Sequence, residues 1–314
     1  MQIVDADTID KVLDEVAVAD ALRDMFRDGC EQPVRHHHGM DVPNEPEATL
    51  LLMPAWQPGS ALGIKIATVF PGANTRGLPA VQASYLLLDA VTGQPQAMLD
   101  GARLTVWRTA AASALAARYL ARRDAAEMVI LGAGALAPFL VRAHLAATPV
   151  KRVTVWNRNF DKAAAMAADL AGCGADVVAS DDLEGVVRQA DLISCATLSQ
   201  EPLVKGEWLK PGAHLDLVGG FTPVMRETDD EAIRRSTVFV DTIDGAPVEA
   251  GDIVKPLESG AMTMDDIAAD LFNLCRGEHQ GRSSDTEITL FKSTGAALED
   301  LAAARLVTSR LAAG

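Results

Sequence analysis

The stretch "VILGAGALAPFL", residues 129–140, is the feature that most restricts how this chain can fold. It runs from an apolar strand through Gly132, Gly134 and Ala137, in the order G-x-G-x-x-A, into a helix. In such a unit the first glycine makes a tight turn, the second lets a pyrophosphate approach the backbone, and the small third residue allows close helix–strand packing. The free N–H groups at the helix start favour a phosphate. The stretch predicts a dinucleotide site; a glycine turn without a ligand is the alternative.

Strands and helices alternate from this glycine turn onward. Apolar strands are expected at residues 127–131, 153–157, 175–179, 190–197, 213–219 and 237–241, and helices between them include 136–147 and 160–172. Buried strands separated by helices are typical of a parallel sheet covered on both faces. The sequence therefore predicts an α/β fold with a Rossmann-type doubly wound parallel sheet.

The first third of the chain has a different pattern. Residues 9–27 predict one amphipathic helix, with Val12, Val16, Ala19 and Met25 near helical spacing. Short apolar runs at 49–56, 61–70 and 83–99 are broken by Pro and Gly and predict antiparallel strands, with a hairpin turn at Thr92-Gly93. An alanine-rich helix follows at 104–124, and residues 276–285 predict a loop. At 314 residues, the chain is long enough for two domains.

Charge and composition narrow the partners and the compartment. The net charge of −15 argues against sequence-independent binding of nucleic acid and against an anionic membrane surface. No run of eighteen apolar residues predicts a membrane span, and the acidic N-terminal segment does not resemble a signal peptide. The four cysteines are scattered, without zinc spacing, which favours free thiols in a reducing cytoplasm. We therefore expect a cytoplasmic protein with a small-molecule substrate.

The end of the second strand indicates which dinucleotide is bound. An NAD site usually has an acidic residue there, on the ribose hydroxyl, whereas this chain has Asn157 and Arg158. An arginine can pair with a 2′-phosphate. We expect NADP(H) to be preferred, with NAD(H) as the alternative cofactor if Arg158 is only a surface cation.

Three basic residues before the glycine turn suggest a site for an acid. Lys65 interrupts the apolar strand "LGIKIATVF", where a lysine is costly unless it faces a carboxylate or a ligand. Arg35 and Arg108 could hold a substrate carboxylate through two hydrogen bonds each, although either could be a surface cation. The neighbouring histidines 36–38 cannot converge on one ion, so we expect no metal site.

These residues carry a resemblance to a known family. The segment from "GIKIATVFPGANTRGLP" to "ARYLA", followed by "LGAGALA", "WNR", "CATLSQEP", "DLVGG" and "FKSTGAALED", resembles the ornithine cyclodeaminase/μ-crystallin family over most of the chain. The resemblance implies a discontinuous α+β domain for substrate binding and dimerisation at residues 1–112 and 288–314, with a Rossmann NAD(P)-binding domain at 113–287. It also implies a homodimer whose N-terminal strands join.

The resemblance also implies particular contacts. Arg35, Lys65 and Arg108 fall where the family binds the substrate carboxylate and imine, and Asn74 falls in a loop near the substrate. Lys65 is the expected catalytic residue. Contacts to the cofactor are implied at Thr109, Gly132, Gly134, Ala135, Leu136, Asn157, Arg158, Ala196, Thr197, Val218, Gly219, Lys292 and Ser293.

Phe221 separates the chemistries within this family. In the cyclodeaminases an aspartate follows the double glycine and moves protons, whereas this chain has Phe221 after Gly219-Gly220. The next acids, Glu227 and Asp229, are expected in the first turn of a helix, where they favour the helix dipole. The turn "GGFTPVMRE" resembles that of the family's bacterial pyrroline-2-carboxylate reductases, and Phe221 could pack on the methylenes of a cyclic imine.

The sequence therefore predicts an NADPH-dependent reductase of Δ1-pyrroline-2-carboxylate or Δ1-piperideine-2-carboxylate, forming L-proline or L-pipecolate. The enzymatic alternatives are an ornithine cyclodeaminase and an alanine- or arginine-type amino-acid dehydrogenase. The alternative of another class is a non-enzymatic NADPH-binding protein like μ-crystallin, against which the intact Lys65 and paired arginines argue.

Overall fold

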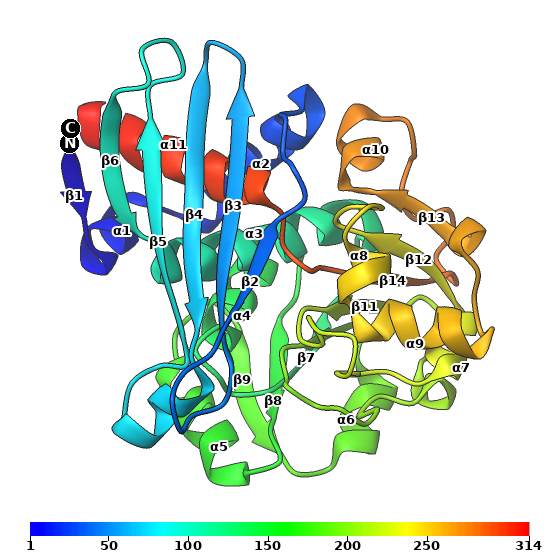
Figure 1. Cartoon of the computed structure of the whole chain (residues 1–314). Helices are drawn as coiled ribbons and strands as arrows, with labels where there is room; N and C mark the ends of the chain where they lie inside the picture. Colours follow the sequence, from blue (N-terminus) through cyan, green and yellow to red (C-terminus); the bar gives the residue numbers. More distant parts are fainter. Residues whose placement is uncertain (314) are drawn as a thin grey trace. The chain divides into compact units, whose positions relative to one another are not determined.

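The computed structural model describes residues 1–313 and divides the chain into two compact units (Figure 1). Unit 1 consists of Met1–Arg108 and Ala296–Gly314, and unit 2 is Thr109–Gly295. No helix in the described part is long and apolar enough to cross a membrane.

Unit 1 is built on a six-stranded sheet. Its strands lie in the order β1-β6-β5-β4-β3-β2, and all neighbours are antiparallel except β1 and β6. The predicted antiparallel strands and the hairpin are confirmed, with Gly93 at φ 72° in its turn. The bounds are β1 (Gln2–Val4), β2 (His36–Met40), β3 (Ala48–Gln57), β4 (Ala61–Val69), β5 (Val81–Leu88) and β6 (Pro95–Asp100).

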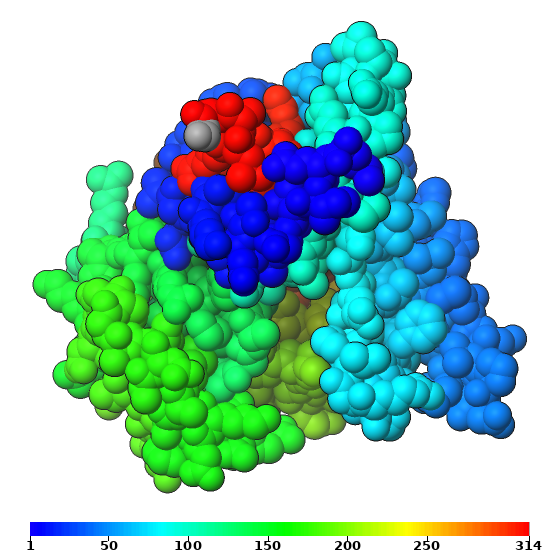
Figure 2. Space-filling view, turned by 90° about the vertical axis from the view of Figure 1, so that its left-hand side faces the viewer, coloured from blue at the N-terminus to red at the C-terminus, as the bar shows by residue number. Residues whose placement is uncertain are grey.

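The helices of unit 1 bring the two ends of the chain together. The C-terminal helix α11 (Ala297–Ala313) contacts β3, β4 and β5 and packs beside α2 (Glu15–Asp28) and α1 (Ala6–Val12). Figure 2 shows this contact between the blue N-terminal residues and the red C-terminal helix. A short 3-10 helix, η1 (Pro71–Arg76), follows β4.

The single helix predicted over residues 9–27 is wrong. Leu13 is extended, with φ −98° and ψ 151°, and ends α1. The Asp14 side chain then accepts a hydrogen bond from the Ala17 N–H and starts α2. The break leaves Val16 47 % exposed, so it does not contribute to the buried face as its spacing suggested.

Unit 2 is built on an eight-stranded sheet in which every neighbouring pair is parallel. The order is β13-β12-β14-β11-β10-β7-β8-β9, so the chain changes direction across the sheet between β7 and β10. The doubly wound prediction is confirmed. The bounds are β7 (Glu127–Leu131), β8 (Arg152–Trp156), β9 (Asp176–Ser180), β10 (Leu192–Cys195), β11 (His214–Leu217), β12 (Ser236–Val240), β13 (Ile267–Asp270) and β14 (Ile288–Lys292).

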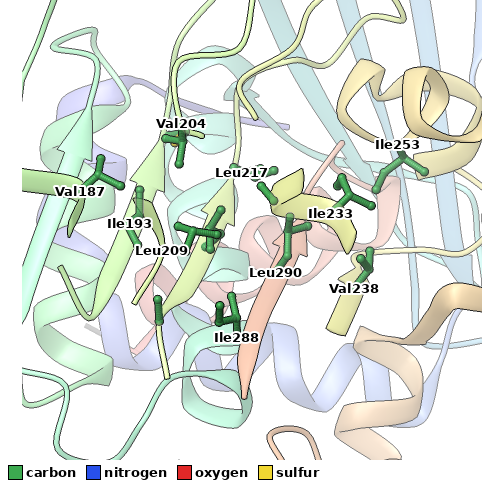
Figure 3. Packing of buried hydrophobic residues seen from close by; sticks show 14 of the residues in the cluster. Val187, Ile193, Val204, Leu209, Leu217, Ile233, Val238, Ile253, Ile288 and Leu290 are labelled. Carbon is green, nitrogen blue, oxygen red and sulfur yellow. The ribbon is translucent and has the colours of Figure 1, made fainter. Parts of the chain in front are cut away.

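Apolar side chains are buried on both faces of this sheet. Successive residues of β7 alternate between two clusters: Met128 and Ile130 join one, while Val129 and Leu131 join the other, part of which Figure 3 shows. The helices of the unit are α3 (Gly101–Leu120, which begins in unit 1), α4 (Ala137–Ala147), α5 (Phe160–Asp169), α6 (Leu183–Gln189), α7 (Asp230–Arg234), α8 (Ala246–Glu249), α9 (Gly251–Ser259), α10 (Leu271–Arg276), η2 (Gly206–Trp208) and η3 (Met264–Asp266).

The units begin and end at other residues than the sequence suggested. The second segment of the first domain was expected to begin at residue 288. It begins later, because β14 pairs with β11 and β12 and belongs to the sheet of unit 2. The first boundary falls after Arg108 rather than after residue 112.

Candidate functional site

The glycine turn after β7 forms an open cradle at the carboxyl end of the sheet. Gly132 has φ 104°, and a Cβ there would lie 2.6 Å from the Ala196 carbonyl oxygen, so no other residue fits. A Cβ on Gly134 would meet no atom within 4 Å, which leaves its backbone open to a ligand. Helix α4 begins without a side-chain cap, so its first N–H groups can receive an anion.

A groove of about 480 Å³ extends from this cradle. Its lining contains two cationic side chains, Arg158 and Lys162, and no carboxylate. That charge is unusual in a chain with a net charge of −15 and suits a phosphate-bearing ligand. The lining residues are Gly132, Ala133, Gly134, Trp156, Asn157, Arg158, Asn159, Lys162, Ala196, Thr197, Leu198, Ser199 and Leu203.

The end of β8 brings an arginine and two asparagines to the groove. Arg158 is exposed and makes no ion pair with any residue between 1 and 313. The Asn157 amide donates to the Asn159 carbonyl at 2.9 Å, and the Asn159 side chain accepts from the Asp161 N–H at the start of α5. The loop is therefore held by asparagines, and it lacks the acidic side chain that usually binds the ribose diol of NAD.

A buried charge cluster lies beneath the turn that follows β11, and we name it the Lys292 cluster: Lys292, Asp252 and Glu227. The Lys292 ammonium donates to the Gly219 carbonyl and lies 3.3 Å from Asp252. Glu227 accepts from the Thr197 N–H and hydroxyl, both at 2.7 Å. The cluster therefore joins the turn to Thr197, a residue of the groove.

One prediction about this region needs correction. Glu227 does not lie in a helix, because α7 begins at Asp230 and Asp229 is its N-cap; Glu227 is fully buried instead. Lys292 and Ser293, which are expected at the cofactor, lie outside the groove lining. Lys292 is fully buried beneath Gly219, and the Ser293 hydroxyl donates to Asp241 at 3.4 Å.

The other residues expected at the cofactor vary in position. Asn157, Arg158, Ala196 and Thr197 line the groove with Gly132 and Gly134. Val218 is buried at the end of β11, next to Gly219. Three further residues lie outside the groove lining: Thr109 on α3, and Ala135 and Leu136 just before α4.

Unit 1 contains a second buried charge cluster, which we name the Lys65 cluster: Lys65, Arg108, Glu299 and Asp300. The Lys65 ammonium lies 3.1 Å from Asp300, and Arg108 pairs with Glu299 at 2.8 Å and with Asp300 at 3.3 Å. All four side chains are buried. The expectation that Lys65 faces a carboxylate is confirmed.

This cluster holds a lysine that can exchange its proton near neutral pH. Burial lowers the pKa of Lys65 to about 8, and the charges of Arg108 and Arg35 act in the same direction, while Asp300 opposes them. Because an ammonium has three donors, the contacts to Asp300 leave Lys65 able to bind a further group.

The remaining expected substrate residues are more exposed. Arg35 is partly exposed, and its charge acts on Lys65. Asn74 is exposed on η1, and Phe221 is 47 % exposed in unit 2. Histidines 36–38 form the exposed edge strand β2. Within the described residues, no three His, Cys, Asp or Glu side chains are grouped to hold a metal ion.

Sequence reasoning missed three acids of the two clusters, Glu299, Asp300 and Asp252, and gave the fourth, Glu227, only a structural role at a helix start. Glu299 and Asp300 had a signal, since a lysine in an apolar strand needs a carboxylate and these two stand in an alanine-rich C-terminal segment. Asp252 had none, because nothing in its local sequence distinguishes it from the neighbouring acids Glu249 and Glu258.

Comparison with known proteins gives a consistent result. The family model of the "Ornithine cyclodeaminase/mu-crystallin family" matches residues 5–314. The chain is 40 % identical to a Δ1-pyrroline-2-carboxylate reductase of Paracoccus denitrificans, over 86 % of this chain and 85 % of that protein. It is 36 % identical to the ketimine reductase mu-crystallin of Rattus norvegicus, over 90 % and 84 %.

Solved structures agree with these relatives. The Δ1-pyrroline-2-carboxylate reductase of Thermococcus litoralis, solved in complex with NADH and L-proline, matches with a TM-score of 0.92 and 31 % identity. The match covers 100 % of this chain and 98 % of that chain, so both units have a counterpart there.

Proposed function

The chain belongs to the ornithine cyclodeaminase/mu-crystallin family, and we propose that this oxidoreductase reduces a cyclic ketimine carboxylate with NADPH. The substrates are Δ1-pyrroline-2-carboxylate or Δ1-piperideine-2-carboxylate, and the products are L-proline or L-pipecolate. The observation that carries the proposal is the Lys65 cluster, because it holds a lysine of lowered pKa among paired charges in a buried site. Two relatives named as pyrroline-2-carboxylate reductases support the substrate class.

The substrate carboxylate is assigned to the cations of unit 1. Arg35 is partly exposed, while Arg108 is fixed by Glu299 and Asp300. A guanidinium held by carboxylates keeps its orientation, so less side-chain entropy is lost on binding. Asn74, exposed on η1, is assigned to the rim of this site.

Lys65 is assigned as the proton donor. Reduction of a C=N bond adds a hydride to carbon and requires a proton on nitrogen, so a donor with a pKa near neutrality is well matched. Asp300 holds the ammonium in one place, and Lys65 regains its proton from solvent after each turnover.

The cofactor is assigned to the groove of unit 2. When bound, the reduced nicotinamide supplies the hydride. The Gly132–Gly134 cradle and the N-terminus of α4 would hold the pyrophosphate, and Arg158 with Lys162 would hold the 2′-phosphate of NADP(H). The Thermococcus litoralis relative was solved with NADH, so the preference of this chain for NADP(H) is our own proposal.

Phe221 favours imine reduction over cyclodeamination. Its exposed ring can cover the apolar methylenes of a cyclic imine, and it cannot accept the protons that deamination releases. We expect Phe221→Asp to lower imine reduction about tenfold, through the loss of apolar contact. Unchanged imine reduction in Phe221→Asp would show that Phe221 does not contact the substrate.

Two other functions keep specific support. A dehydrogenase running towards the amine also reduces an imine, and release of ammonia from an amino acid would identify it or a cyclodeaminase. A non-enzymatic NADPH-binding protein would bind the cofactor and turn over none of a panel of imino acids.

We also propose a homodimer that forms through unit 1. Strand β2 is an edge of the six-stranded sheet, and an edge strand offers backbone groups for pairing with a second copy. Sedimentation equilibrium should give twice the mass of the chain, and a monomer mass at micromolar concentration would contradict this.

An isotope experiment tests the reaction directly. NADPH carrying deuterium at C4 is incubated with freshly prepared pyrroline-2-carboxylate, and the product is analysed by mass spectrometry. We expect one deuterium on Cα of L-proline in wild type and almost none in Lys65→Ala. Label-free proline, or no proline, would refute the proposed function.

A further inference from the structure

The turn after β11 rests directly on buried charged groups. A Cβ on Gly219 would collide with the Thr197 carbonyl oxygen and the Glu227 carboxylate, and one on Gly220, at φ 56°, would lie 2.5 Å from Asp252. Since the backbone of the turn touches the Lys292 cluster, the charge of the cluster acts on whatever binds at the turn.

Glu227 is the unusual member of this cluster. It is fully buried, and its Oε1 accepts two hydrogen bonds from Thr197. Its Oε2 is also buried but has no hydrogen-bond partner among residues 1–313. Burying an ionised carboxylate oxygen that receives no hydrogen bond costs free energy. Protonation of Oε2 removes that charge and so reduces the cost.

The groups that face Glu227 come from three elements. Lys292 extends from β14, Asp252 from α9, and the buried thiol of Cys195 from β10. Asp252 also accepts from the Glu227 N–H at 2.8 Å. With one ammonium and two carboxyls, the cluster has a charge of −1 when Glu227 is ionised and none when it is protonated.

Either state of Glu227 is accessible near neutral pH. Burial raises the pKa of Glu227 to about 7, with Asp252 adding to the rise and Lys292 opposing it. A change of one charge near the turn is therefore enough to change which state dominates.

A nicotinamide cofactor makes that change. The adenine half of a dinucleotide lies on the β8 side of the switch point, so its nicotinamide half lies towards β10 and β11, where Thr197 and Gly219 are found. The oxidised ring has a positive charge and the reduced ring has none. We propose that Glu227 is a positioning residue that holds a proton while the reduced cofactor is bound and releases it to solvent when the oxidised cofactor is bound.

This inference rests on the proposed function, because it requires a nicotinamide at the turn. If the inference holds, the negative charge of ionised Glu227, beneath the turn, neutralises the positive charge of the oxidised nicotinamide above it. Thr197 and Gly219 keep their positions in both states. The pH then sets the relative affinity for the two cofactor forms. Both forms carry the same phosphates, so the ratio of their dissociation constants is insensitive to phosphate protonation.

Equilibrium binding tests the inference without turnover. Dissociation constants for NADPH and NADP⁺ are measured by fluorescence titration between about pH 6 and about pH 8.5. In wild type the ratio Kd(NADPH)/Kd(NADP⁺) should rise about tenfold with pH, which corresponds to a pKa change of about one unit. In Glu227→Gln, which mimics the protonated carboxyl, the ratio should be constant, and the exposed control Glu201→Gln should follow wild type.

Calorimetry of the wild type keeps the inference testable even if Glu227→Gln fails to fold. Titration of NADP⁺ in two buffers of different ionisation enthalpy should show a fraction of a proton released near pH 7, and titration of NADPH should show none. Equal proton release for both forms, or the same pH slope in wild type and Glu227→Gln, would overturn the inference and leave the proposed function standing. Failure of wild type to bind either cofactor would overturn both.

Discussion

The Lys65 cluster of unit 1 and the Lys292 cluster of unit 2 each bury a lysine against carboxylates, yet they hold their exchangeable proton on opposite kinds of group. In the Lys65 cluster burial lowers the pKa of the lysine to about 8, with Arg108 and the nearby Arg35 adding to the fall and Asp300 opposing it. In the Lys292 cluster two acids surround one lysine, and the pKa of Glu227 rises to about 7. Burial is therefore the main cause of the shift in both clusters, and neighbouring like charges add to it.

Burial has opposite effects on the exchangeable protons of the two clusters. Desolvation disfavours the charged form of any group, so it lowers the pKa of a lysine and raises the pKa of a glutamate. In our account the first effect supplies a proton to a substrate nitrogen, and the second adjusts the turn to the charge of the cofactor.

Removing the lysine of the Lys65 cluster should nearly abolish catalysis and leave cofactor binding intact. We expect Lys65→Ala to lower kcat/KM for pyrroline-2-carboxylate by about a thousandfold, because the proton donor is lost. The Kd for NADPH should stay within about twofold of wild type. The exposed Lys11→Ala is the matched control in unit 1. If the affinity for NADPH fell as much as kcat/KM, Lys65 would also contribute to cofactor binding, and the two clusters would not have separate roles.

Removing the arginine of the groove should have the converse effect. We expect Arg158→Ala to raise KM for NADPH about thirtyfold, since a charge-assisted contact to the 2′-phosphate contributes about 2 kcal/mol. KM for NADH should change little, and so should KM for the imine. Equal KM values for NADPH and NADH in wild type would contradict the assignment of NADP(H) as the preferred cofactor.

Removing an acid of the Lys65 cluster should weaken both stability and catalysis. Asp300→Asn leaves Lys65 buried without a carboxylate, which costs about 3 kcal/mol of unfolding free energy. It should also lower the pKa of Lys65 further and so shift the alkaline limb of the pH–rate profile to lower pH. Urea denaturation and the pH profile measure the two effects. A variant as stable as wild type would show that the pair contributes little.

The two clusters should also change stability with pH in opposite directions. The folded state raises the pKa of Glu227 from 4.5 to about 7, so it binds more protons than the unfolded state in that range, and its stability falls as the pH rises. The folded state lowers the pKa of Lys65 from 10.5 to about 8, so the unfolded state binds more protons there, and stability rises with pH.

Melting curves resolve these two contributions. Relative to Glu227→Gln, wild type should lose a few degrees in Tm between pH 4.5 and about 7. Relative to Lys65→Ala, it should gain stability between about pH 8 and 10.5. If Tm changes with pH in the same way in wild type and in a variant, the residue replaced in that variant does not exchange a proton in that pH range.

The sequence was most informative where local rules apply. The glycine spacing around Gly132 and Gly134 predicted the turn before α4, and alternating strands and helices predicted the parallel sheet, because both depend on backbone geometry and local burial. The lysine in an apolar strand predicted a facing carboxylate or ligand, since desolvation makes an unpaired lysine costly there, and Asp300 is that carboxylate.

The sequence was less informative where distant segments meet. Asp300 comes 235 residues after Lys65, and no spacing rule joins them. Glu227 stands two residues before the N-cap Asp229, so its charge suggested a helix start although the chain buries it under Gly219. The strand β14 was assigned to the wrong unit because its partners are known only from the sheet order.

The most direct measurement compares two reactions in one preparation of the wild-type protein. NADPH oxidation is followed with pyrroline-2-carboxylate, and ammonia release is followed with L-ornithine and NADP⁺. We expect rapid reduction of the imine and no ammonia above the rate of the Lys65→Ala variant. Rapid ammonia release with no imine reduction would contradict it and would assign the chain to cyclodeamination despite Phe221.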